Sequence, residues 1–118
     1  MSYVDGYVIP VPKAKRAAYR KMAKLGAEVF TDHGATRVVE CWGDEVPPGK
    51  LTGLDKAVKL KKDEVVVFSW IEWPDKQTRN RGNKKAMADP RFDGMDMRAM
   101  PFDGKRMIFG GFRVLVES

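Results

Sequence analysis

The stretch Met100-Pro-Phe-Asp-Gly-Lys-Arg-Met-Ile-Phe-Gly-Gly-Phe112 leads into the last strand that the sequence predicts. Pro101 ends the segment before it, and Asp103-Gly104 is a pair that tolerates the positive φ angles of a tight turn. The strand predicted at residues 105–117 is the most apolar of the chain. It contains Gly110-Gly111, which we interpret as a bulge or a close backbone approach. The rest of the domain is expected to pack around this strand.

Outward from this stretch, the hydrophobic pattern predicts three further strands and two helices. The strands are expected at residues 3–11, 36–46 and 64–73, and the helices at residues 13–33 and 75–89. Residues 50–63 show no strong period and are left unassigned. The order β-α-β-β-α-β is the ferredoxin-like arrangement, in which two helices cover one face of a four-stranded antiparallel sheet. We therefore predict an α+β fold, with residues 1–118 forming a single domain.

Prolines, glycines and one aspartate indicate where the elements end. The paired part of the first strand is expected to stop near Ile9, because Pro10 cannot donate a ladder hydrogen bond. Gly34 is suited to the position after a helix, and Asp75 or a neighbour is expected to cap the second helix. That helix contains Gly82 and few apolar residues, so its contact with the core is expected to be thin.

The third and last strands are apolar on both faces, whereas a sheet with one solvated face alternates apolar and polar residues. Two helices can cover only one face, and monomers rarely expose a large apolar patch. We therefore predict a homodimer in which two sheets pack about a two-fold axis. The alternative is that the loop at residues 47–63 folds over the open face. One face of the third strand carries Val65, Val67, Ile71 and Trp73, and the other carries Val66, Phe68 and Trp70.

Charge and cysteine content describe the expected environment. Lys and Arg number 22 against 16 Asp and Glu, which gives a net charge of +6, and Cys41 is the single cysteine. One cysteine cannot form an intrachain disulfide, which indicates a reducing compartment. We find no signal sequence and no apolar run of the roughly 20 residues that span a bilayer. The expectation is a cytoplasmic protein without membrane association.

Basic residues gather at 13–24, 56–62 and 76–85, which raises the question of nucleic-acid binding. RNA-binding sheets of this topology stack bases on exposed aromatic side chains. Here the aromatic sheet face is the one expected to form the dimer, and no aromatic-basic octapeptide typical of such sheets is present. RNA binding is therefore a disfavoured alternative, and the basic residues are interpreted as solvated faces.

His33 and Glu40 are the candidate catalytic residues. His33 is the only histidine and continues the apolar stripe of the first helix, Ala14, Ala18, Met22, Leu25 and Val29. It is a possible acid or base, although helix ends also favour histidine for structural reasons. Glu40 shares a predicted strand face with Val38 and Trp42, where desolvation would raise its pKa. Its alternative role is an ion pair with Arg106 or Arg113.

Trp42, Trp70 and Arg106 are the candidate ligand-binding residues. The tryptophans are expected to line a cavity for a flat apolar ligand, although packing in the core or dimer interface explains them as well. Arg106 either binds a carboxylate or forms a surface ion pair. One histidine and one cysteine give no metal signature, so neither a metal nor a cofactor is expected.

Several segments of the chain resemble a family of small bacterial proteins of unknown function typified by YbaA. They are Tyr3-Val-Asp-Gly-Tyr-Val-Ile-Pro-Val-Pro-Lys13, Glu40-Cys-Trp-Gly-Asp44, Phe68-Ser-Trp70, Met87-Ala-Asp-Pro-Arg91 and Met100-Pro-Phe-Asp-Gly-Lys-Arg-Met-Ile108. The resemblance implies the dimeric α/β-barrel superfamily, which includes cofactor-independent monooxygenases, haem enzymes, isomerase-like proteins and plain ligand-binding domains. It implies no catalytic residues, and fold-level analogy does not choose among these functions.

Together these observations predict a protein that binds a small apolar or aromatic molecule between sheet and helices. The expected lining residues are His33, Glu40, Trp42 and Trp70. One alternative is a cofactor-independent monooxygenase- or isomerase-like enzyme in which His33 or Glu40 moves a proton. A non-catalytic interaction or RNA-binding protein is the other.

Overall fold

In residues 2–95 and 100–118, which the computed structural model describes, four strands form one antiparallel sheet. Its order is β2-β3-β1-β4, so that the first and third strands occupy the centre. The long helices α1 and α3 connect β1 to β2 and β3 to β4. The predicted ferredoxin-like α+β arrangement is confirmed. The bounds are β1 Tyr3–Pro12, α1 Arg16–Asp32, β2 Arg37–Trp42, β3 Glu64–Trp73, α3 Lys76–Met87 and β4 Ile108–Arg113.

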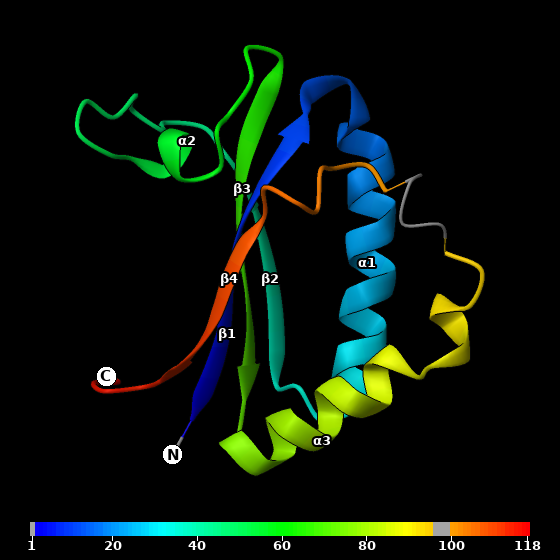
Figure 1. Cartoon of the computed structure of the whole chain (residues 1–118). Helices are drawn as coiled ribbons and strands as arrows, with labels where there is room; N and C mark the ends of the chain where they lie inside the picture. Colours follow the sequence, from blue (N-terminus) through cyan, green and yellow to red (C-terminus); the bar gives the residue numbers. More distant parts are fainter. Residues whose placement is uncertain (1, 96–99) are drawn as a thin grey trace.

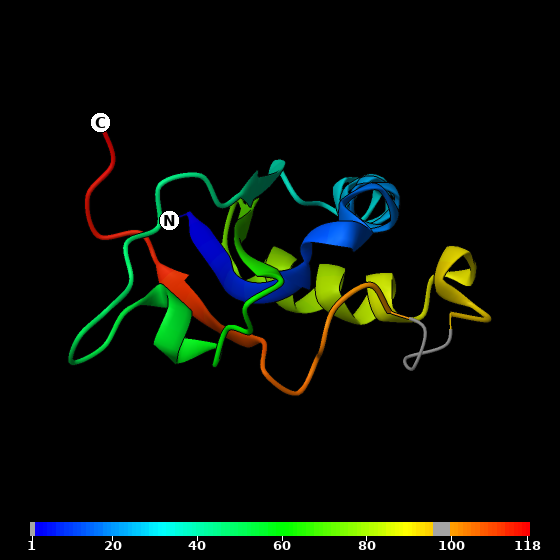
Figure 2. The same cartoon turned by 90° about the horizontal axis from the view of Figure 1, so that it is seen from above.

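Figures 1 and 2 show how the helices lie against the sheet. Helix α1 runs along one face, and α3 extends from the end of β3 toward the C-terminal end of α1 (Figure 1). The short helix α2 (Leu54–Ala57) and its loop project on the other side of the sheet. Within the described residues, none of the helices is long and apolar enough to cross a membrane.

Strand β1 continues further than its prolines suggest. The prediction that pairing stops near Ile9 was wrong, because Pro10 lies opposite Val66 and Pro12 opposite Glu64 of β3. On its other side β1 is paired with β4 only as far as Val8. The proline end of β1 is therefore paired on one side only, a position in which a missing N–H is tolerated.

Strands β2 and β4 are shorter than predicted, and only the C-terminal end of β4 is limited by its neighbour. Arg113 of β4 pairs with Tyr3, the first residue of β1, so the chain beyond Arg113 has no β1 residue left to continue the ladder. Residues 105–107 belong to the turn that precedes β4 instead. Strand β2 ends at Trp42, before the Pro47-Pro48 pair.

The core lies between the sheet and the helices. On the helix side of the sheet the buried residues include Ile9, Val11, Val67, Ile71 and Trp73. The face of α1 that packs against the sheet differs from the predicted apolar stripe. Tyr19 and Val29 are buried in it, whereas Ala14 and Ala18 are exposed. The larger tyrosine ring fills the space that the stripe had assigned to alanine.

The face of the sheet opposite the helices is uncovered, and we call it the open face. Phe68, Ile108 and Phe112 are 49%, 43% and 61% exposed there. Together with Val4, Val8 and Trp70 they line a shallow apolar groove. None of its described lining residues comes from the loop 47–63, so this loop does not cover the open face as the alternative proposed.

Helix α3 is attached to the end of the sheet by close contact and by one buried ion pair. A Cβ atom at Gly82 would lie 2.3 Å from Trp73 Cζ3, so only glycine permits this approach. Arg79 pairs with the buried Asp5 at 2.8 Å. Asp75 accepts a hydrogen bond from the Thr78 amide at 2.7 Å, which confirms the predicted cap.

Candidate functional site

A cavity of about 380 Å³ lies between α1 and β2, and we call it the α1–β2 cavity. Helix α1 supplies one wall, β2 the other, and Val67 of β3 belongs to its floor. The small side chains of Ala23 and Ala27 on α1 leave the space open. The remaining lining residues are Arg16, Tyr19, Arg20, Lys24, Val38, Glu40, Cys41 and Trp42.

Glu40 is the acidic group of this cavity. Tyr19 Oη donates a hydrogen bond of 2.6 Å to Glu40 Oε1, and Ser69 on the neighbouring strand faces the same carboxyl. Burial raises the pKa of Glu40, while the hydrogen bonds from Tyr19 and Ser69 act in the opposite direction. Much of the Glu40 residue remains accessible to solvent, while Tyr19 and Ser69 contact its carboxyl. A carboxyl whose pKa is raised in this way is suited to proton transfer.

Tyr19 remains a phenol hydrogen-bond donor across the physiological range. Its ring is buried, and burial raises its pKa, with the Glu40 carboxylate adding to the effect. The residue was missed from the sequence, because it lies one position beside the predicted apolar stripe. A signal was nevertheless present, since Tyr19 is the only aromatic residue in the first half of the predicted helix.

Three cations line the same cavity, and the sequence analysis assigned them to a solvated face. Arg16, Arg20 and Lys24 recur every four residues, so α1 presents them on one side. The Arg16 guanidinium carbon lies 5.3 Å from the centroid of the Trp42 ring, a cation–π contact. Their four-residue spacing in the sequence was the signal that these cations lie in one row on the helix.

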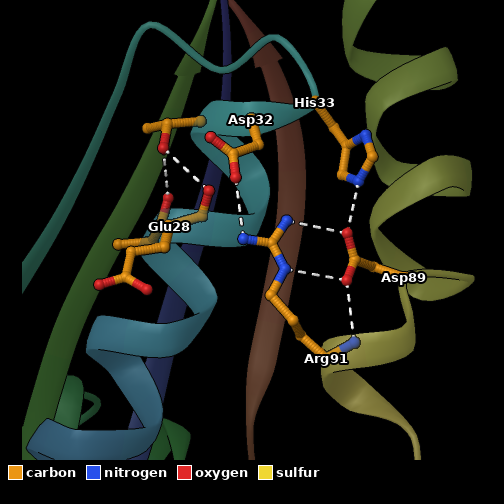
Figure 3. A network of polar contacts seen from close by, with 7 residues as sticks. Glu28, Asp32, His33, Asp89 and Arg91 are labelled. Carbon is orange, nitrogen blue, oxygen red and sulfur yellow. Dashed lines mark hydrogen bonds and ion pairs between the residues drawn. The ribbon is translucent and has the colours of Figure 1, made fainter.

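His33 does not line the cavity. It follows the last residue of α1, where its Nε2 lies 2.8 Å from Asp89 Oδ2. Figure 3 shows the Asp89 carboxylate between the His33 ring and the Arg91 guanidinium, which also contacts Asp32. Tyr19 is about 20 Å away along the helix axis, at 1.5 Å for each residue. The geometry therefore matches the structural alternative for His33.

Trp70 lies on the opposite side of the sheet from Glu40 and Trp42. In the β2–β3 register it pairs with Val39, whereas Ser69 pairs with Glu40, and neighbouring residues of a strand point to opposite faces. Trp70 Nε1 donates to Glu72 Oε2 at 2.9 Å, and its ring packs on Phe68 of the open face. The prediction that Trp70 shares a helix-side cavity with Glu40 was therefore wrong.

Arg106 is held by protein groups. Its guanidinium pairs with Glu64 at 2.6 Å and with Asp103 at 2.9 Å, and it donates to the carbonyl oxygens of Val58 and Lys59. These contacts join the turn before β4 to the start of β3. They correct the alternative in which Arg106 pairs with Glu40, and they occupy the donors that a ligand carboxylate would need.

Within the described ranges, no three His, Cys, Asp or Glu side chains come together as a metal site would require. Cys41 is a free, half-buried thiol. The candidate site therefore consists of an apolar cavity, one carboxyl with a phenol partner, one indole ring and a row of cations.

Comparison with known proteins places this architecture in a family. Residues 2–104 match the family described as "Protein of unknown function (DUF1428)". The chain belongs to the DUF1428 family. It is 51% identical to "Uncharacterized protein YbaA" of Escherichia coli (strain K12) over 118 residues, which cover both chains completely. The same identity and coverage hold for the YbaA protein of Shigella flexneri.

Solved structures of more distant proteins share the fold of this DUF1428 chain. An uncharacterised NIPSNAP domain protein from Burkholderia xenovorans has a TM-score of 0.61 at 18% identity, covering 95% of this chain and 93% of its own. A mutant of SnoaB, a cofactor-independent oxygenase from Streptomyces nogalater, has a TM-score of 0.59 at 16% identity, covering 98% and 95%. At these identities the likeness concerns the fold alone.

Proposed function

We propose that the protein is a homodimer that binds a small apolar or aromatic molecule in the α1–β2 cavity. The observation that supports this proposal best is the Glu40 carboxyl, which accepts a hydrogen bond from Tyr19 and lines the cavity together with Trp42 and several small apolar side chains. Ligand sites are typically apolar and contain a few convergent polar groups that fix orientation. Glu40 and Tyr19 supply such groups, and Trp42 supplies a flat wall.

The dimer is proposed from the open face. Phe68, Ile108 and Phe112 on this face are between 43% and 61% exposed in the single chain, and such a grouping of large apolar side chains is unusual for a monomer. The groove that they form is almost wholly apolar and spans β1, β3 and β4. A second copy of the same face is a chemically matched occupant, because a two-fold interface brings a patch against itself. The cavity on the helix side stays accessible in such a dimer.

A proton-transfer enzyme without a cofactor is a second candidate, and one observation favours it. Glu40 forms no ion pair with any residue in the described part of the chain, so no cation holds its carboxyl in the charged form. A carboxylate at this position would accept a proton from an enol-like or phenolic substrate, leaving the electron pair on the substrate. In that case Glu40→Gln would abolish turnover and retain substrate binding.

Ligand binding is tested by isothermal titration with planar aromatic probes, the neutral 2-naphthol and the anionic 2-naphthoate. We expect at least one of them to bind with a dissociation constant below about 1 mM. Ala27→Leu fills part of the cavity and is expected to weaken binding about tenfold or more. Its matched control is Ala17→Leu, an exposed position of α1 outside the cavity.

Two results would contradict the proposed function. One is that neither probe binds at millimolar concentration. The other is that Ala27→Leu leaves the affinity of a bound probe unchanged, since that probe would then occupy another place on the protein. The open-face groove is the obvious competitor for an apolar probe. Comparing the change in tryptophan fluorescence on probe binding between wild type and Trp42→Phe separates the two places. Trp42 lines the helix-side cavity and does not line the open-face groove.

A further inference from the structure

We propose that the α1–β2 cavity selects small aromatic anions over neutral molecules of the same shape. This inference rests on the proposed ligand-binding function and adds the chemical class of the ligand. The relevant acids are aromatic carboxylates, phenolates and enolates, which combine a flat ring with one negative charge.

The charges that line the cavity support an anion. Arg16, Arg20 and Lys24 contribute three positive charges from successive turns of α1. Glu40 is the only acidic side chain among the described lining residues. The other side chains that form the cavity, apart from Tyr19, are apolar or weakly polar. These cations are exposed to solvent, where they can attract an entering anion.

Arg20 and Lys24 are available for a ligand. Neither residue forms an ion pair with another residue of the described ranges. Arg16 differs, because its guanidinium already stacks on the Trp42 ring. Trp42 itself lines the cavity, so a flat ligand ring would pack on the part of the indole that Arg16 does not cover.

Glu40 is compatible with an anionic ligand only in its neutral form. The groups that face it are Tyr19 from α1, Ser69 from β3 and Tyr7 from β1, in addition to the three cations that line the cavity. Burial already favours the protonated carboxyl, and a bound anion favours it further. Ligand binding is therefore expected to be accompanied by uptake of a proton by Glu40. The protonated carboxyl would then donate a hydrogen bond to the acidic group of the ligand.

The test compares 2-naphthoate with 2-naphthamide, which has nearly the same shape and no charge. Isothermal titration is expected to show the anion binding about tenfold more tightly or better. Repeating the titration in buffers of different ionisation enthalpy measures the protons taken up. We expect net proton uptake for 2-naphthoate and none for 2-naphthamide.

The variant Arg20→Gln/Lys24→Gln is expected to reduce the affinity for 2-naphthoate about fivefold or more and to leave 2-naphthamide unchanged. Lys21→Gln is the matched control, because Lys21 is an exposed cation of the same helix that does not line the cavity. Thermal unfolding verifies that each variant is folded.

The outcomes separate the two proposals. Equal affinities for the two probes would overturn the selection for anions while the proposed function stands. A preference for 2-naphthoate that survives in the double variant, or that Lys21→Gln abolishes equally, would overturn the role of Arg20 and Lys24. If neither probe binds, the proposed function fails and this inference fails with it.

Discussion

Tyr19 Oη donates a 2.6 Å hydrogen bond to Glu40 Oε1, and this contact connects the middle of the cavity's helical wall to its strand wall. The two residues are 21 positions apart in the chain. The phenol offers the carboxyl a partner that carries no charge. As a result, Glu40 has a hydrogen bond in either protonation state, whereas burial still favours the protonated one.

Glu40→Gln should change how stability depends on pH. Because burial raises the pKa of Glu40 above its ordinary value of about 4.3, the folded wild type binds a proton more tightly than the unfolded chain does. Its free energy of unfolding therefore falls as pH rises from the ordinary to the raised pKa. The Glu40→Gln variant has no carboxyl at this position, so its free energy of unfolding does not fall with pH for this reason. Urea unfolding at a series of pH values should show the stability of Glu40→Gln relative to wild type increasing with pH. A difference that stays constant would contradict the desolvated carboxyl.

Gly82→Ala should destabilise the protein although alanine is the better helix former. Its Cβ atom would lie 2.3 Å from Trp73 Cζ3 and 2.6 Å from the His33 carbonyl oxygen, so α3 has to move. We expect a loss of roughly 1–3 kcal/mol in the free energy of unfolding. Gly26→Ala in α1 is the matched control, because no atom lies within 4 Å of its added Cβ. It should stabilise by roughly 0.5–1 kcal/mol, and destabilisation of equal size in both variants would refute the steric argument.

Glu64→Gln should remove a buried ion pair that matters most at neutral pH. The Glu64 side chain is 4% exposed and pairs with Arg106 at 2.6 Å. Hydrogen bonding from Arg106 lowers the pKa of Glu64, so the stability that it contributes is present above the ordinary carboxyl pKa and is lost as pH falls. We expect a cost of about 3 kcal/mol at pH 7, since Arg106 keeps a buried charge with only one acidic partner.

Two comparisons make this ion-pair prediction falsifiable. The difference between wild type and Glu64→Gln should shrink as pH falls below about 4, where the carboxyl of the unfolded wild-type chain takes up a proton before that of the folded protein does. Asp103→Asn removes the second, more exposed partner of Arg106 and should cost clearly less than Glu64→Gln. The prediction would be contradicted if Glu64→Gln and Asp103→Asn lowered the free energy of unfolding equally. It would also be contradicted if the loss in Glu64→Gln did not depend on pH.

Phe68→Lys and Phe112→Lys should each dissociate the proposed dimer. Both side chains lie on the open face, and a two-fold interface there would bury each introduced charge without a partner. Light scattering at micromolar concentration should give twice the monomer mass for wild type and the monomer mass for the variants. Met87→Lys changes a residue of α3 that is 66% exposed and lies away from this face, so it should remain dimeric. A monomeric wild type would refute the dimer.

Much of the fold could be predicted because local patterns agree with the tertiary structure. Strand β3 has the predicted bounds, since a run of β-branched and aromatic residues stands directly before Pro74. Gly34 has the φ of +109° expected of the residue that follows a helix. The end of β4 could not be predicted, because it depends on where the neighbouring strand β1 begins. The short helix α2 has four residues, too few to produce a period.

The candidate site could be predicted only in part. Glu40 and Trp42 were identified because a carboxylate between apolar residues on one strand face is unusual, and the structure places both in the cavity. Trp70 was misplaced because β3 is apolar on both faces, so its pattern does not tell which face meets the helices. The cations of α1 were overlooked because a regular row of charges is also what a solvated helix face contains.

The central position of β1 has a consequence for the newly made chain. Its ten residues are synthesised before both of their partners, which are β3, beginning at Glu64, and β4, beginning at Ile108. Contacts this distant in the sequence slow folding, because a long loop must close before they form. The sheet therefore cannot be completed until β4 has left the ribosome. Until then the apolar faces of β1 and β3 are unprotected, and aggregation competes with folding during this interval.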